Sequence, residues 1–182
     1  MTSDDDLILE TGRGSRTAFE ELFERYRDPI WRFFRRRTSD AGTAEELAQD
    51  TFVAIMEGAH RYRQRGTFRS YLFGTAYNLL QADRRRTTAR AADPLDADPP
   101  APATADPDAE IWVRSAMATL DADDREILML REYEQLSYQE IADVRGTPIN
   151  TVRSQLFRAR MALKAALELR TPHPLRTNHA GR

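Results

Sequence analysis

One stretch of the chain, residues 88–108, cannot contribute to a folded core. It is built mainly from Ala, Asp and Pro, and its apolar residues follow neither a helical nor a strand period. Repeated Pro blocks helix interiors and favours extended, semi-rigid chain. We therefore predict a flexible linker here, with one folded domain before it (residues 4–87) and one after it (residues 109–170). The Pro-containing end, residues 171–182, is expected to be disordered.

The first block has the apolar period of helices and no alternating strand pattern. Large apolar side chains recur every three or four positions between residues 19 and 34, which places them on one helical face. A second helix is expected after Thr43, whose hydroxyl can cap it with Glu46 as capping-box partner. A third is expected from about Thr67 to Arg86. The first helix carries Phe19, Leu22, Phe23, Tyr26, Ile30, Phe33 and Phe34, and the second carries Leu47, Phe52, Ile55 and Met56.

The second block contains the pattern of a helix-turn-helix. Ser137 and Glu140 form a capping box for a short helix, which Gly146 should end. Thr147 can cap the next helix, with Pro148 in its first turn. The apolar stripe of this last helix comprises Ile149, Val152, Leu156, Ala159 and Leu163. We predict an all-α fold of two small helical domains joined by a flexible linker, the C-terminal one being a helix-turn-helix.

Charge is segregated within the C-terminal half, although the whole chain is nearly neutral. The chain has 27 basic and 29 acidic residues. Residues 121–143 contain two basic and eight acidic residues, whereas residues 145–170 contain six basic residues and one acid. Fields fall off within about 10 Å at ordinary salt, so the local excess decides what a surface attracts. The basic segment therefore predicts a nucleic-acid phosphate partner.

Composition argues against several other classes of protein. The 182 residues include no Cys, which excludes disulfides, thiolate nucleophiles and Cys-based zinc sites. Three His residues lack ligand spacing, and no P-loop or Rossmann fingerprint occurs. The N-terminus is acidic where a secretory signal would be basic, and no apolar run approaches a membrane span. We expect a cytoplasmic protein without membrane insertion, cofactor, metal or catalytic residues, which is not an enzyme.

Five segments together resemble the extracytoplasmic-function (ECF) group of bacterial sigma factors. Residues 45–52 (EELAQDTF), 66–73 (GTFRSYLF) and 78–86 (NLLQADRRR) are similar to region 2 of that family. Residues 136–142 (LSYQEIA) and 147–160 (TPINTVRSQLFRAR) are similar to its region 4. Order, separation and linker also agree, so the resemblance covers nearly the whole chain apart from its ends.

The resemblance implies a transcription initiation factor with several partners. Core RNA polymerase would bind region 2 through the clamp of its largest subunit, and promoter DNA would be read at its −10 and −35 elements. An anti-sigma factor is a further partner common in the family. The polymerase-binding positions fall on one polar helix face, for which the alternative is a solvated surface. They are Glu45, Glu46, Gln49 and Asp50.

Family resemblance also implies two DNA-binding sets. One loop would capture a base flipped out of the −10 non-template strand, where arginines can hold phosphates and Tyr62 either stacks or packs in the core. In the last helix, Phe157 lies one residue off the apolar stripe, so it faces DNA unless it packs in the core. The −10 set is Arg61, Tyr62, Arg63, Arg65, Asn78, Arg84, Arg85 and Arg86, and the −35 set is Arg153, Ser154, Phe157 and Arg158.

Some positions depart from the usual family pattern. Tyr71 and Tyr77 stand where the family often has Trp and Arg, which leaves the −10 preference open. Asn150 replaces the usual Gly and Gln155 the usual second Arg, which leaves the −35 preference open.

Two other functions fit parts of the sequence. A DNA-binding activator with a receiver domain would show alternating strands and helices in the first block, but that block is helical. An adaptor that binds polymerase without DNA would leave the basic face of the last helix unexplained.

Overall fold

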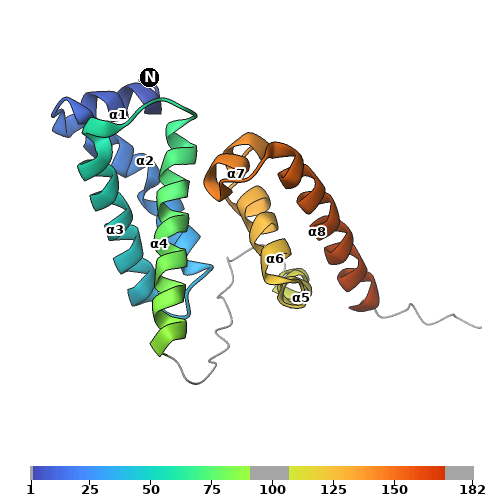
Figure 1. Ribbon diagram of the computed structural model, residues 1–182. Coiled ribbons are helices and arrows are strands. Elements are labelled where there is room, and N and C mark those ends of the chain that lie inside the picture. The colour runs from blue at the N-terminus through green and yellow to red at the C-terminus, as the bar shows by residue number, and fades with distance from the viewer. Residues whose placement is uncertain (1, 91–106, 171–182) are drawn as a thin grey trace, which may run out of the picture.

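The computed structural model in Figure 1 describes residues 2–90 and 107–170. Every regular element within those ranges is a helix, which confirms the predicted all-α fold. The N-terminal half contains α1 (Asp4–Gly12), α2 (Arg16–Arg35), α3 (Ala41–Gly58), the short 3-10 helix η1 (Ala59–Arg61) and α4 (Phe68–Arg90). The C-terminal half contains α5 (Pro107–Ala118), α6 (Ala122–Leu128), the π-helical turn η2 (Met129–Tyr133), α7 (Tyr138–Arg145) and α8 (Ile149–Arg170).

Aromatic side chains of α2 and α4 form the centre of the N-terminal core. Phe33 and Phe34 are fully buried and meet edge to face, with ring centroids 5.1 Å apart. Phe73 of α4 meets Phe33 in the same way at 5.8 Å. Edge-to-face pairs bring the positive ring edge to the negative ring face, so they stabilise beyond simple burial. Most of the predicted stripe of α2 is thus core, although Phe23 is partly exposed beside Phe52.

Helix starts in the N-terminal half agree only partly with the sequence rules. The predicted cap of α3 at Thr43 is wrong: the helix begins at Ala41, and Asp40 accepts from the Thr43 backbone N–H at 2.8 Å. Asp40 has the stronger acceptor, and its pKa is lowered by the hydrogen bonds from Thr43. Thr67 does cap α4, accepting from the Ser70 N–H at 3.1 Å.

The helix-turn-helix is present as predicted. Ser137 and Glu140 make the capping box of α7, and Gly146 ends the helix at φ +62°, where a Cβ would be strained. Val152, Leu156 and Ala159 of α8 are fully buried, as the stripe required. The predicted Thr147 cap is not made, because its hydroxyl is buried without a hydrogen-bond partner.

Helices extend into both ends of the predicted linker. α4 continues to Arg90 and α5 begins at Pro107, so the first three and the last two residues of the predicted linker are helical. The rest of the predicted linker and the predicted tail, residues 171–182, lie outside the described residues. Among the helices of the described part, none combines the length and apolar character that crossing a bilayer requires.

The two halves are in contact along α4 and α7, which lie side by side in Figure 1. A Cβ placed on Gly74 of α4 would lie 3.9 Å from the Cα of Val144, an ordinary packing distance. Buried apolar contact is continuous from one half to the other. The described residues therefore form two helical bundles that are in contact along one boundary, at α4 and α7.

Two substitutions compare the Ser137 hydroxyl, which caps α7, with the Thr147 hydroxyl, which has no hydrogen-bond partner. We expect Ser137→Ala to lower the free energy of unfolding by about 1 kcal/mol, because the α7 cap is lost. Thr147→Val should not lower it and should raise it slightly, because the buried hydroxyl forms no hydrogen bond that offsets its loss of water. Chemical denaturation measures both, and equal losses would contradict the assignment of the caps.

Candidate polymerase- and DNA-binding surfaces

The predicted polymerase-binding residues form one exposed face of α3. Glu45, Glu46, Gln49 and Asp50 are all exposed, whereas Leu47 packs into the core on the opposite side. Sequence reasoning missed that this face continues at helical spacing through two exposed apolar side chains. Val53 is 47% exposed and Met56 is 51% exposed, so Met56 was wrongly placed in the core. The result is an acidic strip that ends in an apolar patch.

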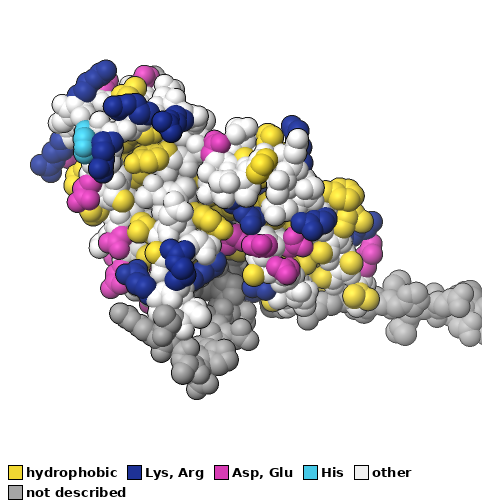
Figure 2. Space-filling model, in the orientation of Figure 1, with side chains coloured by type: hydrophobic (Ala, Val, Ile, Leu, Met, Phe, Trp, Pro, Cys, Tyr) yellow, Lys and Arg dark blue, Asp and Glu magenta, His cyan; other side chains and the backbone are white. Residues whose placement is uncertain are grey.

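The loop between η1 and α4 presents its arginines to solvent. Arg61, Arg63 and Arg65 are exposed, and Figure 2 shows basic side chains gathered at the end of the N-terminal half where this loop lies. Tyr62 points the other way: it is 7% exposed, and its hydroxyl donates to Asp5 Oδ1 at 2.8 Å. Of the two alternatives for Tyr62, packing in the core is the one observed.

The remaining −10 candidates lie along α4, away from this loop. Asn78 is exposed ten residues into the helix, which at 1.5 Å per residue is about 15 Å from its start. The exposed run Arg84 to Arg86 lies nearly two turns further on. Arg84 pairs with Glu126 of α6 at 3.8 Å, and Arg86 pairs with Asp83 at 3.7 Å. The −10 candidates thus form an extended row rather than one cluster.

The four −35 candidates share one exposed face of α8. Arg153 and Phe157 are one turn apart, as are Ser154 and Arg158, so the four side chains are neighbours. Phe157 is 68% exposed, which supports the DNA-facing alternative over core packing. Gln155 lies to the side and accepts a hydrogen bond from Arg145 at 3.3 Å, linking α8 to α7. The departure at this position therefore joins the two helices of the helix-turn-helix.

Arg160 is tied within the C-terminal half. Its guanidinium donates to Glu132 at 2.9 Å and to the Tyr138 hydroxyl at 3.1 Å. These two bonds hold its pKa above the ordinary value. Arg160 is one turn beyond Phe157 on α8, and these two bonds hold its side chain against η2 and the start of α7.

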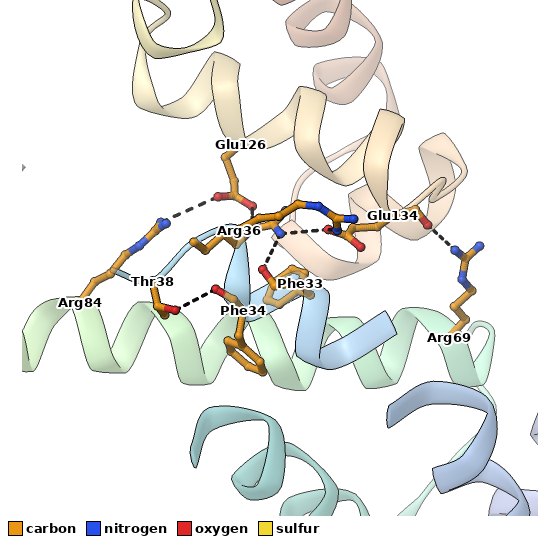
Figure 3. A network of polar contacts seen from close by, with 9 residues as sticks. Phe33, Phe34, Arg36, Thr38, Arg69, Arg84, Glu126 and Glu134 are labelled. Atoms are coloured by element: carbon orange, nitrogen blue, oxygen red, sulfur yellow. Dashed lines mark hydrogen bonds and ion pairs between the residues drawn. The ribbon is translucent and has the colours of Figure 1, made fainter. Parts of the chain in front are cut away.

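An arginine just past the end of α2 joins the two halves. The Arg37 side chain is 1% exposed and donates to Glu126 and Glu134, each at 2.9 Å. Figure 3 shows Glu126 and Glu134 reaching from the C-terminal half toward Phe33 and Arg36 at the end of α2. Arg36 also contacts Glu134 at 3.3 Å and lies over the Tyr133 ring. One buried cation thus meets two buried carboxylates across the boundary.

Electrostatics of this network explain why Arg37 stays charged. Burial alone would lower the pKa of Arg37, but the charges of Glu126 and Glu134 outweigh it and hold the pKa above its ordinary value. One of its nitrogens, Nη2, is nevertheless buried without a hydrogen-bond partner. Such a group is stable only while both carboxylates remain, because an uncompensated buried charge is costly.

Helix α7 lies against the end of the predicted −10 loop. Thr67 donates from Oγ1 to Glu140 at 3.0 Å, and a Cβ on Gly66 would lie 3.0 Å from Asp143 Oδ2. Arg69 donates to the Gln135 carbonyl at 3.3 Å and to the Glu134 carbonyl. Two acids of α7 thus lie beside Thr67 and Gly66, and Arg69 is bonded to the chain just before α7.

Two family models match the chain in the order found in the structure. The model described as Sigma-70 region 2 matches residues 22–90, and the one described as Sigma-70, region 4 matches residues 110–163. The first runs from Leu22 within α2 to the end of α4, and the second covers nearly all of the C-terminal half. Helix α1 precedes the matched part.

Curated relatives are similar over almost their whole length. The RNA polymerase sigma-H factor of Pseudomonas aeruginosa is 33% identical over 181 residues, covering 91% of this chain and 94% of the relative. The ECF RNA polymerase sigma factor SigC of Mycobacterium tuberculosis is 33% identical over 178 residues, with the same coverages.

Solved structures with the same fold include two described as complexes. CnrH in complex with the cytosolic domain of CnrY has a TM-score of 0.70 at 23% identity, covering 93% of this chain and 100% of that one. The sigma factor RpoE in complex with the anti-sigma factor NepR from Bartonella quintana has a TM-score of 0.71 at 22% identity, covering 84% and 98%. At these identities the likeness shows the fold.

Neutralising the two buried carboxylates should open the boundary between the halves. In the variant Glu126→Gln with Glu134→Gln, Arg37 keeps its charge without a counter-charge, at a cost of about 3–5 kcal/mol. We expect a larger radius of gyration by small-angle X-ray scattering, with helicity retained. Glu132→Gln is the control, since Glu132 is exposed and pairs with Arg160 within one half. An unchanged radius in the folded double variant would contradict this role.

Proposed function

Because the chain belongs to the ECF group of RNA polymerase sigma-70 factors, we propose that its two halves divide the work of promoter recognition. The protein is a transcription initiation factor that acts with RNA polymerase at promoters. We assign polymerase binding and the −10 element to residues 4–87, and the −35 element to residues 109–170. The observation that carries this division is the presence of both region matches, in order, on the two helical halves.

The acidic face of α3 is the proposed contact with the polymerase clamp. Glu45, Glu46 and Asp50 are exposed, and nothing in the described part of the chain covers them. The apolar side chains of Val53 and Met56 extend the face and supply area that loses water on binding. Charge selects the partner and its orientation, while the apolar end adds affinity.

Charge reversal on this face tests the function and the surface together. The wild-type chain, mixed with sigma-free core polymerase, should co-migrate with it and start transcription on genomic fragments that core enzyme ignores. Replacing Glu45, Glu46 and Asp50 with Lys should abolish both, because the face proposed to contact the clamp then carries the opposite charge.

The matched control reverses three exposed acids elsewhere in the same half, Glu10, Glu20 and Glu24, and should keep both activities. Normal polymerase binding by the folded α3 variant would remove these residues from the surface. Tight, specific duplex binding by the chain without polymerase would instead favour an independent DNA-binding regulator.

The −10 strand is assigned to the arginine loop and the outer side of α4. Arg61, Arg63 and Arg65 can hold successive phosphates, while the Asn78 amide can pair with a base edge. Arg84 to Arg86 extend the basic row along the strand. Tyr62 supports this loop from within the core. Binding that favours the unpaired strand over the duplex shifts the equilibrium toward melted DNA without a chemical step. No catalytic residue, metal or cofactor is required, so we propose that the protein is not an enzyme.

The −35 element is assigned to the exposed face of α8. An α-helix fits the major groove, where Arg forms bidentate bonds to guanine and an aromatic ring can contact a thymine methyl group. The neighbouring side chains of Arg153, Ser154, Phe157 and Arg158 have the spacing for such contacts. The Gln155 to Arg145 bond keeps the reading helix fixed on α7.

Removing two −35 side chains should weaken sequence reading and leave polymerase binding intact. For Ser154→Ala with Arg158→Ala, we expect discrimination between promoter and substituted −35 duplexes to fall by about 1–3 kcal/mol per lost base contact. Lys164→Ala is the control, because Lys164 is exposed further along α8 and pairs with Glu168. An unchanged −35 footprint in the double variant would exclude these two residues.

Partners and location follow from the same assignment. Core polymerase and promoter DNA place the protein in the cytoplasm. An anti-sigma factor is a further proposed partner, supported by the complexes in which two proteins of this fold were solved.

A further inference from the structure

We propose that helix α1 is the positioning element of the −10 loop, and that Asp5 holds both ends of that loop through one carboxylate. This inference rests on the assignment of residues 60–66 to the −10 strand. α1 precedes the part of the chain that matches region 2, and none of the proposed DNA- or polymerase-binding residues lies on it. Its own contacts with the loop define its role.

A single oxygen of Asp5 receives hydrogen bonds from both ends of the loop. Asp5 Oδ1 accepts from the Tyr62 hydroxyl at 2.8 Å and from the Phe68 backbone N–H at 2.9 Å. Phe68 is the first residue of α4, so this bond satisfies a helix N–H that has no partner within the helix. The carboxylate also lies at the positive end of the α4 dipole. The segment from Tyr62 to Phe68 is thus closed by one side chain.

The other end of α1 contacts the start of the same segment. A Cβ placed on Gly12 would lie 2.6 Å from the carbonyl oxygen of Ala59 and 3.3 Å from the Cα of His60. These atoms are backbone, so a larger residue at position 12 would push η1 away. Glycine therefore allows α1 to lie directly on the turn that precedes the loop. Asp5 thus holds the two ends of the loop, while Gly12 lets α1 lie on η1 just before it.

Fixing Tyr62 directs the arginines on either side of it. The Tyr62 ring is buried and meets the Tyr71 ring at 5.1 Å, so neither end of this side chain is free to move. Burial and the bond to Asp5 raise the pKa of Tyr62, so its hydroxyl stays a donor. Arg61 and Arg63 flank an inward residue and are therefore turned outward. Arg63 additionally donates to the Tyr62 carbonyl at 3.1 Å.

Three successive aspartates of α1 have three different contacts, which provides built-in controls. Asp4 binds Arg25 and Tyr26 of α2 and so ties α1 to the bundle. Asp5 binds the loop. Asp6 is exposed, and its hydrogen bonds are with the Ser3 hydroxyl at the start of the same helix. A change at Asp6 alters the charge of the same helix turn without touching the loop.

The test measures how holoenzyme selects −10 strands. Single-stranded oligonucleotides carry the −10 sequence of a promoter recovered with wild-type holoenzyme, with each base replaced in turn. We expect Asp5→Ala to lower affinity for the unsubstituted strand about ten-fold and to reduce discrimination among the substituted strands. Binding to core polymerase and to −35 duplex should be unchanged. Asp6→Ala should behave as wild type.

The variant Tyr62→Phe tests the positioning of the loop without disturbing the packing of the core. It removes one donor to Asp5 and keeps the ring in the core, so the protein should fold normally while affinity for the −10 strand falls less than in Asp5→Ala. The double variant should be no worse than Asp5→Ala alone, because the hydroxyl has already lost its acceptor. Additive losses in the double variant would overturn a shared action through the Asp5 to Tyr62 bond.

The combined variant Arg61→Ala, Arg63→Ala distinguishes failure of the inference from failure of the proposed function. Lost −10 binding in this variant, together with wild-type affinity and base discrimination in folded Asp5→Ala, would overturn the positioning role alone. Wild-type binding by both variants would overturn the assignment of the loop to DNA and the inference with it.

Discussion

The buried contact of Arg37 with Glu126 and Glu134 sets how the two halves meet. A guanidinium that is 1% exposed must find opposite charge, and no carboxylate of the N-terminal half bonds it among the described residues. Its partners come instead from positions 89 and 97 residues later in the chain. Because removing either partner leaves a buried charge uncompensated, the two halves pack in one relative position, which is the register of the boundary. The apolar packing of α7 on α4 follows that register.

This register places three acidic residues of the C-terminal half against the N-terminal half. Glu126, Glu134 and Glu140 make these contacts, while the basic face of α8 remains exposed. The near-neutral total charge of the chain hides this division. Arg84 shows the consequence most directly, since a candidate for the −10 strand is paired with Glu126 at 3.8 Å. One surface therefore serves both the packing of the halves and the proposed DNA contact.

Sequence rules that use only neighbouring residues predicted those features of the fold that depend only on neighbouring residues. The Ser137 capping box, the Gly146 stop and the α8 stripe all depend on residues within one or two turns, and each was confirmed. Thr43 failed because Asp40, three residues earlier, is the better acceptor for the same helix start. The sequence could not reveal that Arg37 is buried between the two halves. A run of three arginines at positions 35 to 37 is equally typical of a solvated helix end. Asp5 was equally hidden, since its partners lie 57 and 63 residues away.

The loop from residue 60 to 68 is contacted by acidic side chains from two directions, with different consequences. Asp5 accepts from groups that face inward, so its charge is used within the fold. Glu140 and Asp143 of α7 lie instead beside Thr67 and Gly66, at the end of the loop. If the loop arginines hold phosphates, those phosphates and the α7 carboxylates repel each other at short range. Strand binding then favours displacement of α7, while α1, whose Asp5 carboxylate is bonded to Tyr62 and Phe68, can keep the loop in place throughout.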